Sequence, residues 1–235
     1  MAFRAESRGI YTETSFLTEE EQFLLMKKKF CVGVCLKGGY REAERKIAVF
    51  GDEKTLGYPW EGSLAFLKIA PKHPKFAENL THRDYLGSLM GLGIKREFLG
   101  DLILKNEEAY LVCLESIVSF LMQNLEKVRH TAVFLQQLEA LPENCLPQTE
   151  ESTAVSASSR LDALVAGVWN LSRSEAKALV EGEKVSVNGG VVTNPSKEIE
   201  AGSKISARGF GKFYFDGVLS ETRSGRIRVR IRLFV

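Results

Sequence analysis

The sequence predicts an α+β protein made of several parts. Residues 64–135 alternate strand-like and helix-like apolar patterns in the order β-α-β-β-α-β, and residues 158–210 place two helix patterns before several strand patterns. The length of 235 residues is enough for two or three small domains. The expected parts are an N-terminal α/β subdomain at 1–62, a middle domain at 63–140, a linker at 141–157 and a small C-terminal domain at 158–235.

The first 62 residues carry a helix pattern followed by short strand patterns. Thr18 and Glu21 have the spacing of a capping box, which predicts a helix that runs to about Lys29. Residues 30–36 and 47–50 are apolar runs typical of short buried strands. The patterns fit either a separate domain or a helical extension of the middle domain.

The middle domain has the most regular rhythm. Thr81 and Asp84 form a second capping-box pattern, which predicts a helix between the first two strands. Asn106-Glu107 predicts a turn between the second and third strands. The predicted strands cover residues 64–69, 102–104, 109–113 and 131–135, and the predicted helices begin at 81 and 116. This order is that of a ferredoxin-like, or RRM-like, domain.

The aromatic residues of the third predicted strand indicate whether this sheet could stack RNA bases. RNA recognition domains carry several stacking aromatic residues there. This strand offers only Tyr110. Two interpretations of this domain therefore remain: the sheet binds RNA, or the domain is a scaffold whose sheet binds none.

Residues 141–157 have the composition of a linker. They combine Pro142 and Pro147 with serine, threonine and glutamate, which favour loops. We therefore expect this segment to join the middle domain to the C-terminal one.

Residues 158–210 predict two short helices against a small sheet. Ser158 or Ser159 is placed to N-cap the first helix. Ser172 forms a capping box with Glu175 and begins the second helix. Asn188-Gly189 is a hairpin turn signal between two strand patterns.

Basic side chains gather on this C-terminal domain. From residue 156 onward there are 13 Lys and Arg against 8 Asp and Glu, whereas residues 1–155 hold 19 against 22. We expect five basic residues to share one face and to contact phosphates, with Ser172 also able to reach RNA. They are Arg160, Arg173, Lys177, Lys184 and Arg208. The alternative for each is an ordinary solvated charge.

The last 23 residues predict a β-hairpin whose final limb alternates arginine with aliphatic residues. At a period of two, the arginines fall on one face of the strand. They are Arg226, Arg228, Arg230 and Arg232. We expect the first three to extend the RNA-binding surface as a phosphate rail; charged residues on a strand also discourage edge-to-edge aggregation.

A second phosphate site is possible near the middle of the chain. Lys95 and Arg96 follow a Gly-rich turn, and Arg83 is near in sequence. The alternative is a solvated loop.

Several other classes of protein and site are disfavoured by the sequence. The four cysteines form no C-x-x-C pair, and the three histidines have no metal-ligand spacing, so we expect no metal and no cofactor. No phosphate-binding loop or dinucleotide fingerprint occurs. Charged residues interrupt the N-terminus and no apolar run reaches the roughly 20 residues that span a bilayer, so we expect a cytoplasmic protein without a membrane partner. We also expect a monomer.

Long motifs in the chain resemble known families. Arg160-Leu161-Asp162 and the stretch from Ser172 to Gly189 resemble the RNA-binding domain first seen in ribosomal protein S-four. With Gly38 to Lys46 and Thr81 to Asp101, they resemble the YlmH family of bacterial ribosome-associated proteins. Ser159 departs from the leucine expected there, which affects a local packing contact only.

The resemblance implies a function that composition and spacing do not. It implies a non-enzymatic factor that binds ribosomal RNA of the large subunit, and peptidyl-tRNA, in the quality control of stalled translation. The C-terminal domain would hold ribosomal RNA and the rest would approach tRNA.

Two alternatives come from other classes. His82-Arg83-Asp84 superficially resembles a catalytic loop of pseudouridine synthases, so Asp84 is a candidate catalytic residue of an RNA-modifying enzyme. Those enzymes usually carry the RNA-binding domain before a longer catalytic domain, unlike this chain. The other alternative is an adaptor whose acidic N-terminal half binds a protein.

Overall fold

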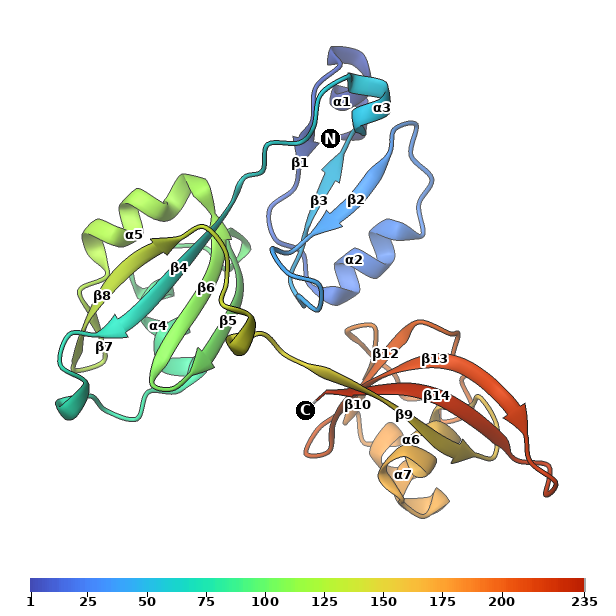
Figure 1. The fold of residues 1–235 in the computed structure, drawn as a ribbon. Helices are drawn as coiled ribbons and strands as arrows, with labels where there is room; N and C mark the ends of the chain where they lie inside the picture. Colours follow the sequence, from blue (N-terminus) through green and yellow to red (C-terminus); the bar gives the residue numbers. More distant parts are fainter. Residues whose placement is uncertain (235) are drawn as a thin grey trace. The chain divides into compact units, whose positions relative to one another are not determined.

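The computed structural model describes residues 1–234 and has a mixed α/β fold (Figure 1). It divides into two compact units, Met1–Leu146 and the residues from Pro147 onward. Each unit has its own hydrophobic core. No helix within residues 1–234 combines the length and the apolar character needed to cross a bilayer.

Unit 1 begins with a small antiparallel sheet of strand order β1-β3-β2. Its elements are α1 (Ala2–Arg8), β1 (Thr12–Glu13), α2 (Glu19–Met26), β2 (Val34–Lys37), β3 (Ile47–Phe50) and α3 (Glu53–Leu56). The predicted capping box is present, since the Thr18 backbone N–H donates to Glu21 Oε2 at 2.7 Å. The buried strand predicted at 30–36 is instead Val34–Lys37, since the chain bends at Cys31 and Val32, and its residues are half-buried or exposed. Phe30 packs edge-on against Phe50 at 5.2 Å between ring centroids.

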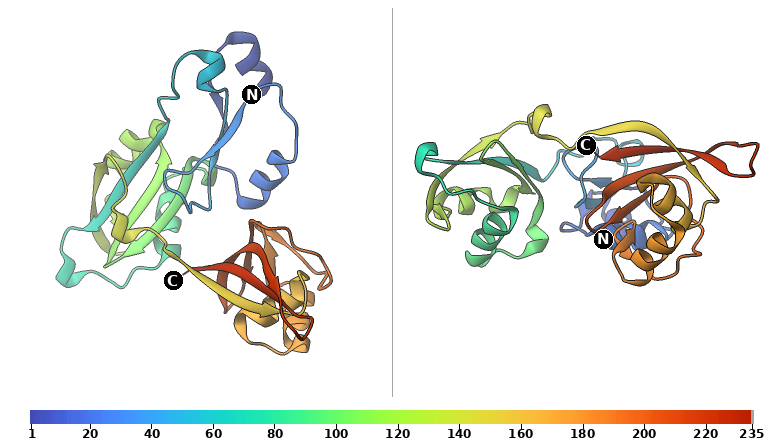
Figure 2. Two further views of the ribbon diagram at one scale, coloured as in Figure 1. Left: turned by 45° about the vertical axis from the view of Figure 1, so that its right-hand side comes forward. Right: turned by 90° about the horizontal axis from the view of Figure 1, so that it is seen from below.

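The rest of unit 1 is a five-stranded antiparallel sheet of order β5-β6-β4-β8-β7. Its elements are β4 (Leu64–Pro71), η1 (Pro74–Phe76), α4 (His82–Gly91), η2 (Arg96–Phe98), β5 (Leu99–Lys105), β6 (Glu108–Leu114), η3 (Glu115–Ile117), α5 (Val118–Asn124), β7 (Lys127–Val128) and β8 (Thr131–Leu138). The element order β-α-β-β-α-β agrees with the sequence prediction, and β7 is an addition. Helices α4 and α5 cover the same face of this sheet (Figure 2).

The opposite face of the five-stranded sheet is covered by the N-terminal residues. Tyr110 and Val112 of β6 share a hydrophobic cluster with Phe16, Ile47 and Val49. Tyr110 is only 8% exposed and its hydroxyl donates to Glu108 Oε2 at 2.8 Å. The segments 1–62 and 63–140, which we expected as separate parts, therefore share a core within one unit.

A buried carboxylate ties the two sheets of unit 1 together. Asp101, on β5, accepts hydrogen bonds from the Tyr40 hydroxyl at 2.6 Å, the Glu44 backbone N–H at 2.7 Å and the Arg45 backbone N–H at 3.0 Å. The Arg45 side chain in turn donates to the carbonyls of Leu99 and Phe16. Burial and the nearby carboxylate of Asp101 raise the pKa of Tyr40. Motifs 60 positions apart in sequence thus meet in one network.

Unit 2 is an antiparallel sheet of order β11-β10-β12-β13-β14-β9 with two helices packed on it. A short turn, η4 (Glu143–Cys145), precedes it at the end of unit 1. The elements of unit 2 are β9 (Thr149–Ser156), α6 (Leu161–Trp169), α7 (Arg173–Glu181), β10 (Val185–Val187), β11 (Gly190–Val191), β12 (Ser203–Ala207), β13 (Gly211–Glu221) and β14 (Ile227–Phe234). The predicted hairpin turn is present, with φ of 49° at Asn188 and 80° at Gly189.

Two predictions for this unit are corrected. The segment 141–157 is not only a linker, because Thr149–Ser156 forms β9 and pairs with β14 from Phe234↔Thr149 to Ile227↔Ser156. Its β-branched residues suit a strand, but the residues it pairs with lie 71 to 85 positions away. The N-cap of α6 is Arg160 rather than Ser158 or Ser159, because the Ser159 carbonyl is already bound by the Ile199 backbone N–H at 3.0 Å.

Candidate nucleic-acid interface

The centre of the site is a buried carboxylate in the first turn of α6. Asp162 is 2% exposed, and its two oxygens accept from Arg160 Nε at 3.1 Å and from the terminal guanidinium nitrogen Nη2 at 2.9 Å. Arg173 of α7 approaches the same carboxylate with Nε at 3.5 Å. One buried anion therefore fixes two arginines from different helices. Sequence reasoning noted Arg160-Leu161-Asp162 as a motif but did not give Asp162 this role.

The protonation of Asp162 is linked to the stability of unit 2. Burial alone would raise the pKa of Asp162, but the hydrogen bonds and charge of Arg160, with the charge of Arg173, lower it below its ordinary value. A depressed folded-state pKa gives stability that is present above the unfolded pKa of about 4 and is lost as the pH falls through the folded pKa. We expect the melting temperature of wild-type unit 2 to fall toward that of Asp162→Asn as the pH drops from about 6 to about 3. Circular dichroism melts of the two proteins test this, and a gap that stays constant with pH would contradict it.

Three of the five predicted phosphate ligands line one hollow of about 520 Å³. They are Arg160, Arg173 and Lys177, beside Asp162, Ser174, Glu181, Pro195 and Ser196. Lys177 Nζ lies 3.6 Å from Glu181 Oε1, an exposed pair of the kind that contributes little to stability. Ser172 is occupied as the N-cap of α7, where its backbone N–H donates to Glu175 Oε2 at 2.8 Å.

The other two predicted ligands line a different hollow. Lys184 and Arg208 are exposed and border a hollow of about 380 Å³ together with Lys212. The Arg208 backbone N–H donates to the Lys184 carbonyl at 2.9 Å, so the two residues are held side by side. We expected all five residues on one face, but the structure places them in two separate hollows.

The arginine row of β14 has the predicted alternation. Arg228 and Arg230 of β14 are exposed, as is Arg226 just before the strand, whereas Val229 and Ile231 are buried in the core that α6 and α7 share. Because side chains alternate across a strand, the arginines of β14 lie on the sheet face turned away from the helices. They therefore do not extend the hollow on the helices but form another basic surface. Arg232 is bound to Asp216 through Nε at 2.8 Å and another guanidinium nitrogen at 3.1 Å, and it stacks over Tyr214.

The second phosphate site expected from Arg83, Lys95 and Arg96 is not assembled. Arg83 is in the first turn of α4 and Lys95 follows its last turn, so a helix of about 15 Å separates them. Arg96 donates to the backbone carbonyls of Leu99 and Gly100, and burial lowers its pKa to about 10. Arg96 therefore supports the protein interior, while Arg83 and Lys95 are exposed.

Asp84, the candidate catalytic residue, is part of a helix cap. It accepts from the Thr81 backbone N–H at 2.8 Å and from the Thr81 hydroxyl at 2.7 Å. Arg129 lies 3.6 Å from its other oxygen. The hydrogen bonds from Thr81 lower the pKa of Asp84, which keeps it ionised in its structural role. Within residues 1–234, no group of three His, Cys, Asp or Glu side chains is placed to hold a metal ion.

Comparison with known proteins covers almost the whole chain. The family described as "Putative RNA-binding domain in YlmH" matches residues 63–141, and the S4 domain matches residues 159–205. The protein of Bacillus subtilis (strain 168) named "Ribosome-associated protein quality control protein P2" is 30% identical over 219 residues, which cover 92% of this chain and 84% of that protein. A solved structure, the cell division protein ylmH from Streptococcus pneumoniae, is 20% identical with a TM-score of 0.47 and covers 58% of this chain and 83% of that one. The shared length and identity with the Bacillus subtilis protein, together with the two matched domains, show that this chain belongs to the YlmH family and carries an S4 domain in unit 2.

Proposed function

We propose that this protein binds ribosomal RNA of the large subunit and peptidyl-tRNA, without catalysing a reaction, in the quality control of stalled translation. The name of the Bacillus subtilis relative supports association with the ribosome and with quality control. The two matched domains support binding of RNA. On this account the protein acts as a monomer in the cytoplasm, which is where ribosomes stall.

The observation that carries the proposal is the pair of arginines fixed by Asp162. Arg160 is bound by both carboxylate oxygens, and Arg173 is bound only by Nε, at 3.5 Å, with its side chain 65% exposed. The remaining N–H groups of Arg173 are thus left for another partner, and Arg173 lines the same hollow as Lys177. Guanidinium and ammonium groups bind phosphate and release counterions from RNA. The hollow on α6 and α7 is therefore suited to the RNA backbone.

The middle domain serves best as a scaffold. Its strand order, with β4 between β6 and β8 and two helices on one face, supports the ferredoxin-like assignment. The face that RNA recognition domains use for base stacking is here covered by residues of the first 62 positions. RNA contacts of unit 1 are accordingly expected outside this sheet.

Sedimentation tests the proposed function. Tagged protein in a bacterial lysate is separated on a sucrose gradient at low and at high salt. Migration with large subunits that is lost at high salt supports electrostatic binding to ribosomal RNA. Migration only at the top of the gradient at both salt concentrations contradicts it.

The enzymatic alternative is tested at Asp84. We expect Asp84→Asn to cost roughly 1 kcal/mol, the usual effect of weakening a helix cap, and to leave RNA binding unchanged. Thermal melts and an RNA-binding titration measure both effects. A lost RNA modification, detected by mass spectrometry of ribosomal RNA and tRNA from cells that carry the variant, would instead identify Asp84 as catalytic.

A further inference from the structure

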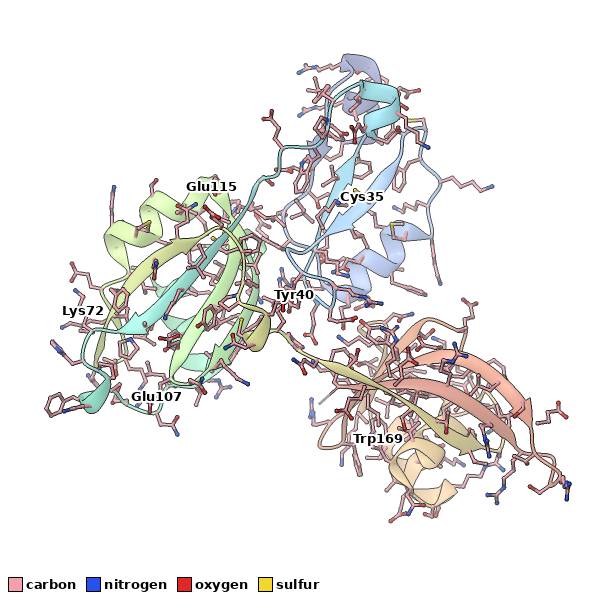
Figure 3. All side chains as sticks on the ribbon, viewed as in Figure 1. Cys35, Tyr40, Lys72, Glu107, Glu115 and Trp169 are labelled. Carbon is pink, nitrogen blue, oxygen red and sulfur yellow. The ribbon has the colours of Figure 1, made fainter. Side chains whose placement is uncertain are left out.

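Unit 1 has a hollow of about 450 Å³ that none of the predicted site residues touches. The loop after β2 and the segment that leads into β4 form its walls, and Tyr40, labelled in Figure 3, lies between the two sheets of unit 1. Its lining includes the charged and aromatic side chains Lys37, Tyr40, Arg41, Lys46, Trp60 and Phe66. Most of them precede residue 63, where the matched RNA-binding domain begins.

The lining of this hollow has a one-sided charge. It includes Lys37, Arg41 and Lys46, and none of the residues that line it is acidic. Three carboxylates outside the lining bind its residues: Glu42 lies 3.6 Å from Arg41 Nε, Glu13 accepts from the Trp60 indole N–H, and Asp101 accepts from the Tyr40 hydroxyl. The Arg41 side chain nevertheless remains 88% exposed. Three cations around one hollow in an otherwise acidic half of the chain favour an anionic ligand.

The hollow also presents a fixed aromatic ring. The Trp60 indole N–H donates to Glu13 Oε2 at 3.3 Å, which holds the plane of the ring. The ammonium of Lys37 lies 6.0 Å from the centroid of the Trp60 ring, at the outer limit of a cation–π contact. An aromatic ring and a basic side chain therefore lie together in this hollow.

The wall opposite is closely packed, because the backbone of the loop after β2 lies directly against Phe66 and Ala43. Gly39 has a φ of +87°, and a Cβ there would lie 2.6 Å from Phe66 Cε1. A Cβ on Gly38 would lie 2.4 Å from the Cβ of Ala43. The Tyr40 hydroxyl is bound to Asp101 at 2.6 Å. These contacts hold the loop after β2 against the rest of unit 1.

We propose that this hollow binds one unpaired nucleotide of an RNA strand, with the base stacked on Trp60 and the flanking phosphates on Lys37, Arg41 and Lys46. The proposal rests on the proposed function in that it takes the ligand to be RNA. A volume of about 450 Å³ is in the range of small-molecule sites, which suits a single nucleotide. Stacking on an aromatic side chain, with basic residues along the backbone, is how proteins hold single-stranded nucleic acid.

Tryptophan fluorescence tests this directly, because the chain has only two tryptophans, Trp60 and Trp169. In the full-length Trp169→Phe variant, Trp60 is the only indole. We expect a single-stranded octaadenylate RNA to quench its emission in a saturable titration, and a blunt RNA hairpin to leave it unchanged. Lys37→Ala with Arg41→Ala should raise the midpoint about tenfold, at roughly half a decade per lost phosphate contact.

Two matched variants separate the outcomes. Lys28→Ala with Lys29→Ala removes the same charge from exposed positions of unit 1 outside the hollow and should leave the midpoint unchanged. Arg173→Ala with Lys177→Ala disables the hollow of unit 2 and should also leave the Trp60 signal unchanged, so failure of the proposed function and failure of this site are distinguishable. Absence of quenching in a folded protein, or equal quenching by the hairpin, would overturn the proposal.

Discussion

Replacing Asp101 by alanine is expected to destabilise unit 1 by about 3 kcal/mol or more. The change leaves three donors without their acceptor: the Tyr40 hydroxyl and the backbone N–H groups of Glu44 and Arg45. Asp101 is only 9% exposed, so water has little access to replace it. Each unsatisfied buried donor costs about 1–3 kcal/mol, against a total stability of about 5–15 kcal/mol for a typical domain. Thermal unfolding followed by circular dichroism measures the loss.

Tyr40→Phe is the matched control for Asp101. It removes one donor but keeps the carboxylate bound to the two backbone N–H groups. The expected loss is about 1 kcal/mol, the net value of one hydrogen bond. If Tyr40→Phe and Asp101→Ala lowered stability equally, the carboxylate would not be the centre of the network.

Replacing Arg173 and Lys177 together by alanine is expected to weaken RNA binding about tenfold and to reduce the salt slope by about two units. Both side chains are exposed in the hollow of unit 2. Asp162 keeps its bidentate partner Arg160, and the pair of Lys177 with Glu181 is a surface pair. Fluorescence anisotropy with labelled large-subunit ribosomal RNA, at several salt concentrations, gives both quantities.

The charge-matched control for this test is Lys28→Ala with Lys29→Ala. These residues are exposed in unit 1 and line neither of the basic hollows of unit 2. Their removal should change the salt slope by much less than two units. Equal effects from the two double variants would mean that RNA responds to net charge and not to the hollow on α6 and α7.

Local features of the fold could be predicted from the sequence. The capping boxes at Thr18, Thr81 and Ser172 connect residues three positions apart, and all three are present. The Asn106-Glu107 turn has positive φ at both residues, as a tight hairpin requires. Such features depend on neighbours in the chain, which a sequence displays directly.

Features that depend on distant residues could not be predicted in this way. The strand β9 was not predicted, because its segment has the composition of a loop and its partner β14 lies far along the chain. Arg96 has the sequence context of an exposed loop, but its side chain is partly buried because it donates hydrogen bonds to the carbonyls of Leu99 and Gly100. The role of Asp162 required two helices to pack, and only their packing brings Arg173 to the carboxylate that binds Arg160.

The arginine row shows the same limit within one element. Alternation along β14 predicted that its arginines share a face, and Arg226, Arg228 and Arg230 are exposed. Which face that is depends on where α6 and α7 pack, and they pack on the aliphatic side. The pattern of a strand thus predicts which side chains share a face, but it does not predict how far that face lies from the hollow on α6 and α7.

The most direct test of the central claim is pelleting with purified large ribosomal subunits. Wild-type protein, Arg173→Ala with Lys177→Ala, and Lys28→Ala with Lys29→Ala are each mixed with subunits at moderate salt and centrifuged through a cushion. The account predicts that the wild type and the unit 1 control pellet equally, while the unit 2 variant stays mostly in the supernatant. Equal pelleting of all three proteins would contradict the assignment of the hollow on α6 and α7 as the contact with ribosomal RNA.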